Sequence, residues 1–122
     1  MIDLRQSHHE ILLFFSGLRY VCVTNAENIA IAIFYIGEDG VLSCPLSDVN
    51  IAWNFYPESR DRIHISHMNR LVDSSGKYAI SGPNLTVTDV TFDDAGKYLC
   101  DSLDGPTHRR LRFNVTVQQR GN

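Results

Sequence analysis

Three cysteines carry the most readily interpreted chemistry in this sequence. A disulfide forms and persists in an oxidising compartment, and an odd number of cysteines leaves one thiol outside any internal pair. Three cysteines therefore allow one internal disulfide and leave one cysteine outside it.

Histidine, serine and aspartate side chains do not combine into a catalytic or metal-binding pattern. His64 and His67 are three residues apart in a strand-like segment, which predicts that they lie on opposite faces, whereas zinc ligands converge on one point. The sequence has no nucleophile elbow, no recognisable Ser-His-Asp triad setting and no glycine-rich phosphate loop. We expect no enzymatic activity, no metal ion and no cofactor.

Length and composition fit a single globular domain. The chain has 122 residues, 43% of them hydrophobic and 20% charged, which is enough for one two-sheet core and too few for a second. Its net charge of -3 gives no electrostatic reason to bind nucleic acid or anionic membranes. No apolar stretch of about 18 residues follows the domain, so we expect a secreted chain or a fragment of a longer protein.

The segment Asp94–Cys100 predicts a strand that follows a tight corner. Side chains alternate along a strand, so Tyr98 and Cys100 share the inward face and Leu99 points the other way. A tyrosine two residues before a cysteine can bury its ring while its hydroxyl bonds the backbone of the turn. Gly96 fits the corner itself.

Alternating apolar residues predict further strands. They cover residues 28–34, 41–46, 51–55, 62–68, 77–81 and 110–117, with another beginning near Asn84, and turn-forming residues separate them. We expect residues 28–34 to be an edge strand with one buried side. Ala52, Asn54 and Tyr56 are expected on the outer face of their sheet.

These features resemble the immunoglobulin domain, nearest the variable-type and intermediate sets of cell-surface receptors. The resemblance covers roughly residues 28–118 and rests on Cys44, Trp53 and the motif Asp94-x-Gly96-x-Tyr98-x-Cys100. It implies an all-β sandwich of two antiparallel sheets joined by one disulfide, Cys44–Cys100, with Trp53, Tyr98 and Leu85 in the core. The length between Trp53 and Cys100 leaves room for extra strands and favours the variable type.

The resemblance also implies an ion pair between Asp94 and a basic residue at the start of the strand 77–81. Lys77 holds that position, where the family usually has arginine, and lysine lacks the bidentate fork of arginine. Cys22 is then the remaining cysteine, which is removed with a leader, bonded to another chain, or free.

Residues 1–27 have two interpretations. An apolar run, residues 11–15 and 20–23, followed by small residues at 24–26, is typical of a signal peptide, although Arg19 interrupts it. The alternative is an N-terminal extension, an ordered strand or helix packed on the sandwich. Residues 119–122 are expected to form a C-terminal tail.

In sandwiches of this type recognition uses the loops and the outer face of one sheet. Here that sheet contains strands 51–55, 62–68, 94–100 and 110–117, and we call it the front sheet. The candidate protein-binding residues, chosen from this sheet and the loop 101–109, are Tyr56, Leu99, Leu103, Arg110 and Arg112. Sequons at Asn84 and Asn114 are candidate glycosylation sites, the alternative for each being an unmodified strand residue.

The resemblance implies a non-catalytic recognition module outside the cell, secreted or part of an immune-receptor or adhesion-type membrane protein. Its partner is expected to be a cell-surface or soluble protein, with homophilic pairing through the front sheet as one option. Nucleic acid and direct membrane insertion are not expected. The alternatives are a structural, intracellular module with reduced cysteines, and a soluble decoy or cytokine-receptor fragment.

Overall fold

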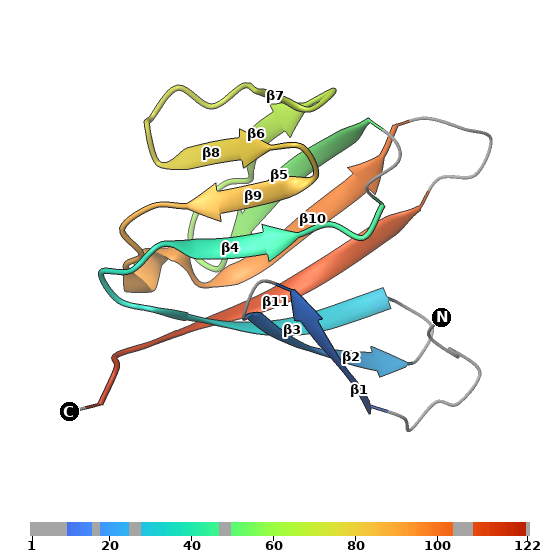
Figure 1. The fold of residues 1–122 in the computed structure, drawn as a ribbon. Helices are drawn as coiled ribbons and strands as arrows, with labels where there is room; N and C mark the ends of the chain where they lie inside the picture. Colours follow the sequence, from blue (N-terminus) through green and yellow to red (C-terminus); the bar gives the residue numbers. More distant parts are fainter. Residues whose placement is uncertain (1–9, 16–17, 25–27, 47–49, 104–108, 122) are drawn as a thin grey trace.

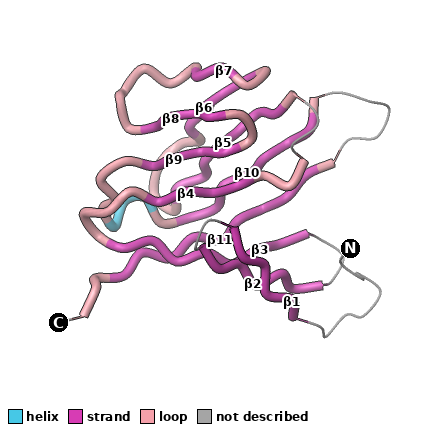
Figure 2. The backbone as a smooth tube through the Cα atoms, in the orientation of Figure 1, coloured by secondary structure: helices cyan, strands magenta, loops and turns pink. Residues whose placement is uncertain are grey.

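Two β-sheets face each other in this protein (Figure 1). The computed structural model describes residues 10–15, 18–24, 28–46, 50–103 and 109–121. Strands and loops make up nearly all of this part of the chain, as Figure 2 shows. Its one helical element is a short 3-10 turn, η1 (Phe92–Asp94).

The larger sheet contains all the strands predicted for the front sheet, and we keep that name for it. Its eight strands, in spatial order, are β1 (Glu10–Phe15), β2 (Leu18–Thr24), β3 (Asn28–Tyr35), β11 (Arg110–Gln118), β10 (Gly96–Ser102), β5 (Ile51–Pro57), β6 (Ile63–His67) and β7 (Arg70–Leu71). The back sheet contains β4 (Gly40–Ser43), β9 (Asn84–Val87) and β8 (Tyr78–Ser81) in that order. The apolar side chains between the two sheets form the core.

One disulfide joins the sheets. Cys44, just after β4, is bonded to Cys100 in β10, with their Cα atoms 6.2 Å apart. The ring of Trp53 is 1% exposed and lies against Phe113, while Tyr98 is fully buried. These observations confirm the predicted all-β sandwich with a single disulfide between its sheets.

Strands β6 and β7 continue the front sheet beyond β5. A variable-type immunoglobulin domain differs from the constant type by two such additional strands in this sheet. The segment between Trp53 and Cys100 contains these two strands, so the arrangement is that of the variable type.

The prediction that residues 28–34 form an edge strand is wrong. β3 pairs with β11 on one side and with β2 on the other. Its buried side carries Ala30 and Ala32, whereas Ile31 and Ile33 on the opposite side are 39% and 43% exposed. The error arose because the second neighbour of this strand comes from a segment whose structure the sequence pattern left open.

Part of the N-terminal segment belongs to the front sheet. β1 and β2 form an antiparallel hairpin that extends the sheet past β3. In this register Cys22 lies opposite Ala30. Whether residues 1–27 are cleaved stays a prediction, and the three alternatives for Cys22 stay open.

Candidate functional site

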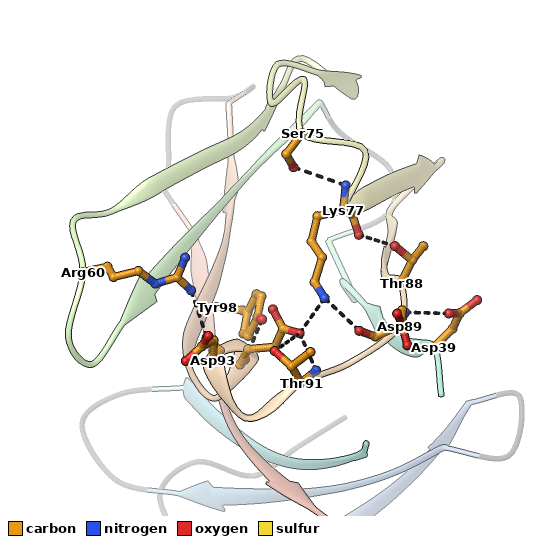
Figure 3. Close-up of polar contacts among 10 residues, drawn as sticks. Asp39, Arg60, Ser75, Lys77, Thr88, Asp89, Thr91, Asp93 and Tyr98 are labelled. Atoms are coloured by element: carbon orange, nitrogen blue, oxygen red, sulfur yellow. Dashed lines mark hydrogen bonds and ion pairs between the residues drawn. The ribbon is translucent and has the colours of Figure 1, made fainter. Parts of the chain in front are cut away.

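The corner before β10 is organised by one buried carboxylate. Asp94 is 3% exposed, and its Oδ2 atom accepts a hydrogen bond from the Thr91 N–H at 2.8 Å and lies 2.8 Å from Lys77 Nζ. Lys77, directly before β8, also donates to the Asp89 carbonyl at 2.9 Å (Figure 3). The Tyr98 hydroxyl donates to the Asp94 carbonyl at 2.7 Å. The hydrogen bonds and the ion pair leave these buried polar groups paired and connect the two sheets, so the corner stabilises the fold.

Burial raises the pKa of both core tyrosines. Burial and, next, the nearby Asp94 carboxylate raise the pKa of Tyr78 to about 12. The Tyr98 ring stacks on Phe55 at a centroid distance of 4.1 Å, and burial raises its pKa as well. Both phenols stay protonated at neutral pH, which makes them core rings rather than candidate bases.

The outer surface of the front sheet presents side chains in rows that cross its strands. One row contains Ile29, Arg112, Leu99, Asn54 and His64, and the next contains Ile31, Asn114, Lys97 and Tyr56. We call this surface the front face. It includes four of the five candidate protein-binding residues, since side chains at alternate positions of a strand share a face.

The structure spreads the candidate binding residues along the front face. Leu99 and Arg112 lie directly opposite each other and are half-buried. Tyr56, 41% exposed, lies one row away opposite Lys97. Leu103, 38% exposed, follows the far end of β10, and roughly 20 Å of strand separates it from the row of Lys97. The residues therefore do not form one compact patch.

Arg110 is already engaged by an acid of the neighbouring strand. Its Nε atom donates to Asp101 Oδ1 at 2.5 Å, and this hydrogen bond raises the pKa of the guanidinium. The Arg110 side chain is nevertheless 55% exposed, compared with 12% for that of Asp101. Part of its guanidinium therefore remains accessible at the rim of the front face.

A polar cluster on β5 and β6 was not anticipated from the sequence. Asn54 Oδ1 lies 2.8 Å from His64 Nδ1 and 3.4 Å from Arg62 Nη1. Asn54 is on the outer side of its strand, yet neighbouring side chains leave it only 7% exposed. No local signal predicts this cluster, because its members meet only when β5 and β6 pair.

The prediction that His64 and His67 lie on opposite faces is wrong. The pairing of β5 and β6 shifts by one residue: Ser66 lies opposite Trp53, but the next residue of β5 pairs with His64. Ile65 is thus the extra residue of a β-bulge, and the two histidine rings lie 5.8 Å apart between centroids. Within the described ranges, no three or more His, Cys, Asp or Glu side chains are grouped so as to hold a metal ion.

Asn50 links three loops at the end of the sandwich where β10 ends. Its carbonyl accepts the Leu103 N–H at 2.8 Å, and its side-chain Oδ1 accepts a hydrogen bond from Asn69 Nδ2 at 3.4 Å. Asn69 follows the exposed Met68 in a two-residue turn in which both have positive φ, 53° and 61°. The asparagine was the available signal for this turn, since it tolerates the left-handed conformation.

The two sequons lie in different sheets. Asn84 is the first residue of β9 in the back sheet, and Asn114 lies in the middle of β11 on the front face. Both are half-buried, and Asn114 Oδ1 is fully buried. Of the predicted loop 101–109, residues 104–108 lie outside the described residues.

The two facing sheets, their disulfide beside Trp53 and the strands β6 and β7 define an immunoglobulin domain of the variable type. Solved structures have the same fold. Tim-1 superposes with a TM-score of 0.58 at 19% identity, covering 75% of this chain and 94% of that chain. The second immunoglobulin domain of the mouse polymeric immunoglobulin receptor gives 0.58 at 16% identity, covering 76% and 99%.

The N-terminal four immunoglobulin domains of Dscam1 isoform 7.44 also match, with a TM-score of 0.58 at 19% identity, over 84% of this chain and 26% of that chain. A profile described as adenovirus E3 region protein CR1 matches residues 22–120. The chain therefore belongs to the adenovirus E3 region protein CR1 family. Comparison with curated proteins finds no match.

Proposed function

We propose that this chain is a non-catalytic recognition module that acts outside the cell and binds a protein ligand through the front face. The observation that carries the proposal is the composition of that face. Tyr56, Ile31 and Ile33 are each about two-fifths exposed, with Arg110 and Arg112 on the same surface. Exposed apolar and aromatic groups beside arginine are typical of protein interfaces.

The disulfide supports the extracellular part of the proposal. A bond between Cys44 and Cys100 is stable in an oxidising compartment and is rare in cytosolic proteins. This argues against the structural intracellular module with reduced cysteines. Within the described residues, no helix is long and apolar enough to span a bilayer.

The proposal is tested with the full chain, its disulfide intact, against an array of cell-surface and secreted ectodomains. For any ligand found, Tyr56→Ala and Leu103→Ala should each weaken binding about tenfold, as expected for residues at a hot spot. Phe92→Ala is the matched control, because Phe92 is 64% exposed but lies in η1, outside the front sheet.

Unchanged affinity in both the Tyr56 and Leu103 variants would remove these two residues, and the part of the front face around them, from the binding surface. Sedimentation of the chain alone tests the homophilic option. A dimer that Tyr56→Ala dissociates would identify the ligand as a second copy. If neither a ligand nor a dimer is found, the recognition function itself is contradicted.

A further inference from the structure

Basic side chains gather at the outer end of the front face, where β6 and β7 lie. The four residues are Arg62, His64, His67 and Arg70. The bulge at Ile65 places both histidines on the same side, with their rings 5.8 Å apart. Arg70 lies opposite His67 in the β6–β7 pair, so their side chains share a face. We call these residues the β6–β7 basic cluster.

Two members of the cluster, Arg62 and His64, are held in place by the side chain of Asn54 on β5. Arg62 Nη1 lies 3.4 Å and His64 Nδ1 lies 2.8 Å from Asn54 Oδ1. A guanidinium can only donate, so the Asn54 atom that it contacts is the acceptor oxygen, and His64 Nδ1 therefore carries a hydrogen. Asn54 thus fixes the orientation of two basic groups before a ligand arrives, so that less side-chain entropy is lost on binding.

In the described residues no carboxylate is recorded in an ion pair with the cluster. Three ion pairs, Lys77–Asp94, Arg110–Asp101 and Arg120–Glu38, each join side chains outside the cluster. Asp73, which follows β7, accepts hydrogen bonds from the backbone and hydroxyl of Ser75, so its own turn engages it. The cluster is positive in a chain of net charge -3, and an anionic ligand complements it.

Exposed apolar residues adjoin the basic cluster. Met68, Leu71 and Val72 are 47%, 45% and 53% exposed. β7 is also the last strand of the front sheet in the described chain, so no further strand of that sheet pairs with its outer edge. A sulfated sugar or a nucleic acid would use the cations but leave this apolar edge uncovered, whereas a peptide with acidic and apolar residues would use both.

From these observations we propose that the β6–β7 edge binds an acidic, partly apolar segment of a protein partner. The inference rests on the proposed function, in that the partner is a protein. It adds the chemistry of that partner and the part of the front face that receives it. Arginine fits this role because its planar guanidinium binds carboxylates through two parallel hydrogen bonds.

The test uses the isotope-labelled full chain and a synthetic peptide of alternating glutamate and leucine, followed by NMR. We expect saturable shift changes concentrated in residues 62–72, and an affinity that falls about tenfold or more when sodium chloride is raised several-fold, because salt screens exposed charges. The double variant Arg62→Glu/Arg70→Glu should weaken binding at least about tenfold. A peptide with lysine in place of glutamate should not bind.

Arg60→Glu/Arg120→Glu is the matched control, because it changes the net charge equally, Arg60 donates to the Asp93 carbonyl in η1, and both residues lie outside the cluster. An equal loss of peptide affinity in this control, or NMR shift changes centred outside residues 62–72, would overturn the inference. Binding of heparin without binding of the peptide would overturn it too. A protein ligand sensitive to Tyr56→Ala but not to the Arg62/Arg70 variant would contradict this inference and leave the proposed function standing.

Discussion

Lys77 Nζ lies 2.8 Å from Asp94 Oδ2, so the bridge between the back sheet and the corner of β10 forms with lysine where related domains usually have arginine. The two side chains are 26% and 5% exposed. Lysine suffices here because the second oxygen contact of an arginine fork is replaced by the Asp89 carbonyl, which Nζ also reaches, at 2.9 Å.

The first prediction concerns this pair. Lys77→Met keeps the apolar stem but leaves the Asp94 carboxylate buried without its cation, which should lower the free energy of unfolding by about 3 kcal/mol. Urea denaturation measures the change. Arg120→Met removes the exposed pair with Glu38 and should alter stability far less. Equal effects in the two variants would contradict this account of the corner.

The second prediction concerns the disulfide. Cys44 and Cys100 are 56 positions apart, and in the chain-entropy model a loop of this length stabilises the fold by about 4 kcal/mol. Cys44→Ala/Cys100→Ala should therefore lose about that amount in denaturant unfolding. Cys22→Ser serves as the control, and a comparable loss in that variant would show that Cys22 matters to stability in its own right.

The third prediction concerns Gly96, whose φ is +145°. A β-carbon there would lie 2.7 Å from the Tyr56 carbonyl oxygen and 2.9 Å from the Phe55 ring. Gly96→Ala should cost about 3 kcal/mol or more, because backbone strain and a clash add. Gly82→Ala tests strain alone, at φ +57° with open space around it, and should cost about 1 kcal/mol. Thermal unfolding of the two variants separates the contributions.

The fourth prediction concerns alkaline pH. Burial raises the pKa of Tyr78 to about 12 in the folded protein, above the ordinary tyrosine pKa of about 10. Its contribution to stability is therefore fully present below pH 10 and is lost as the pH rises towards 12, because the unfolded chain releases this proton first. Tyr78→Phe should flatten the decline of the unfolding free energy over this range. Tyr56→Phe, at an exposed position, should leave the decline in place.

The fifth prediction concerns the sequons. Asn84 begins a strand beside the turn at Gly82, whereas Asn114 lies mid-strand with a buried side-chain oxygen. We expect a glycan at Asn84, and a front face without one. In protein secreted from mammalian cells, the mass shift on glycosidase treatment should disappear in Thr86→Ala and persist in Thr116→Ala. The reverse pattern would place a glycan on the candidate binding surface.

The sandwich was predictable because its strongest signals are local or depend only on order along the chain. Alternation placed Leu85 and Tyr98 on inward faces, and both are fully buried. The sequence also indicated Tyr56 as an outward residue, and it is exposed. The candidate site was predictable as a face of one sheet, but not as a set of contacts, because neighbours on adjacent strands depend on register.

The sequence by itself determined the strands and the corner at residues 94–100, because alternation, turn residues and that motif are properties of short segments. The resemblance to immunoglobulin domains then implied the sandwich and the Cys44–Cys100 disulfide, which the structure confirms. Only the tertiary structure decided that β3 lies inside its sheet and that His64 and His67 share a face. The physical reason is that the register of paired strands decides which face each side chain occupies. The bulged residue Ile65 moves the side chains beyond it to the opposite face of β6, and contacts between residues far apart in the sequence decide where that bulge forms.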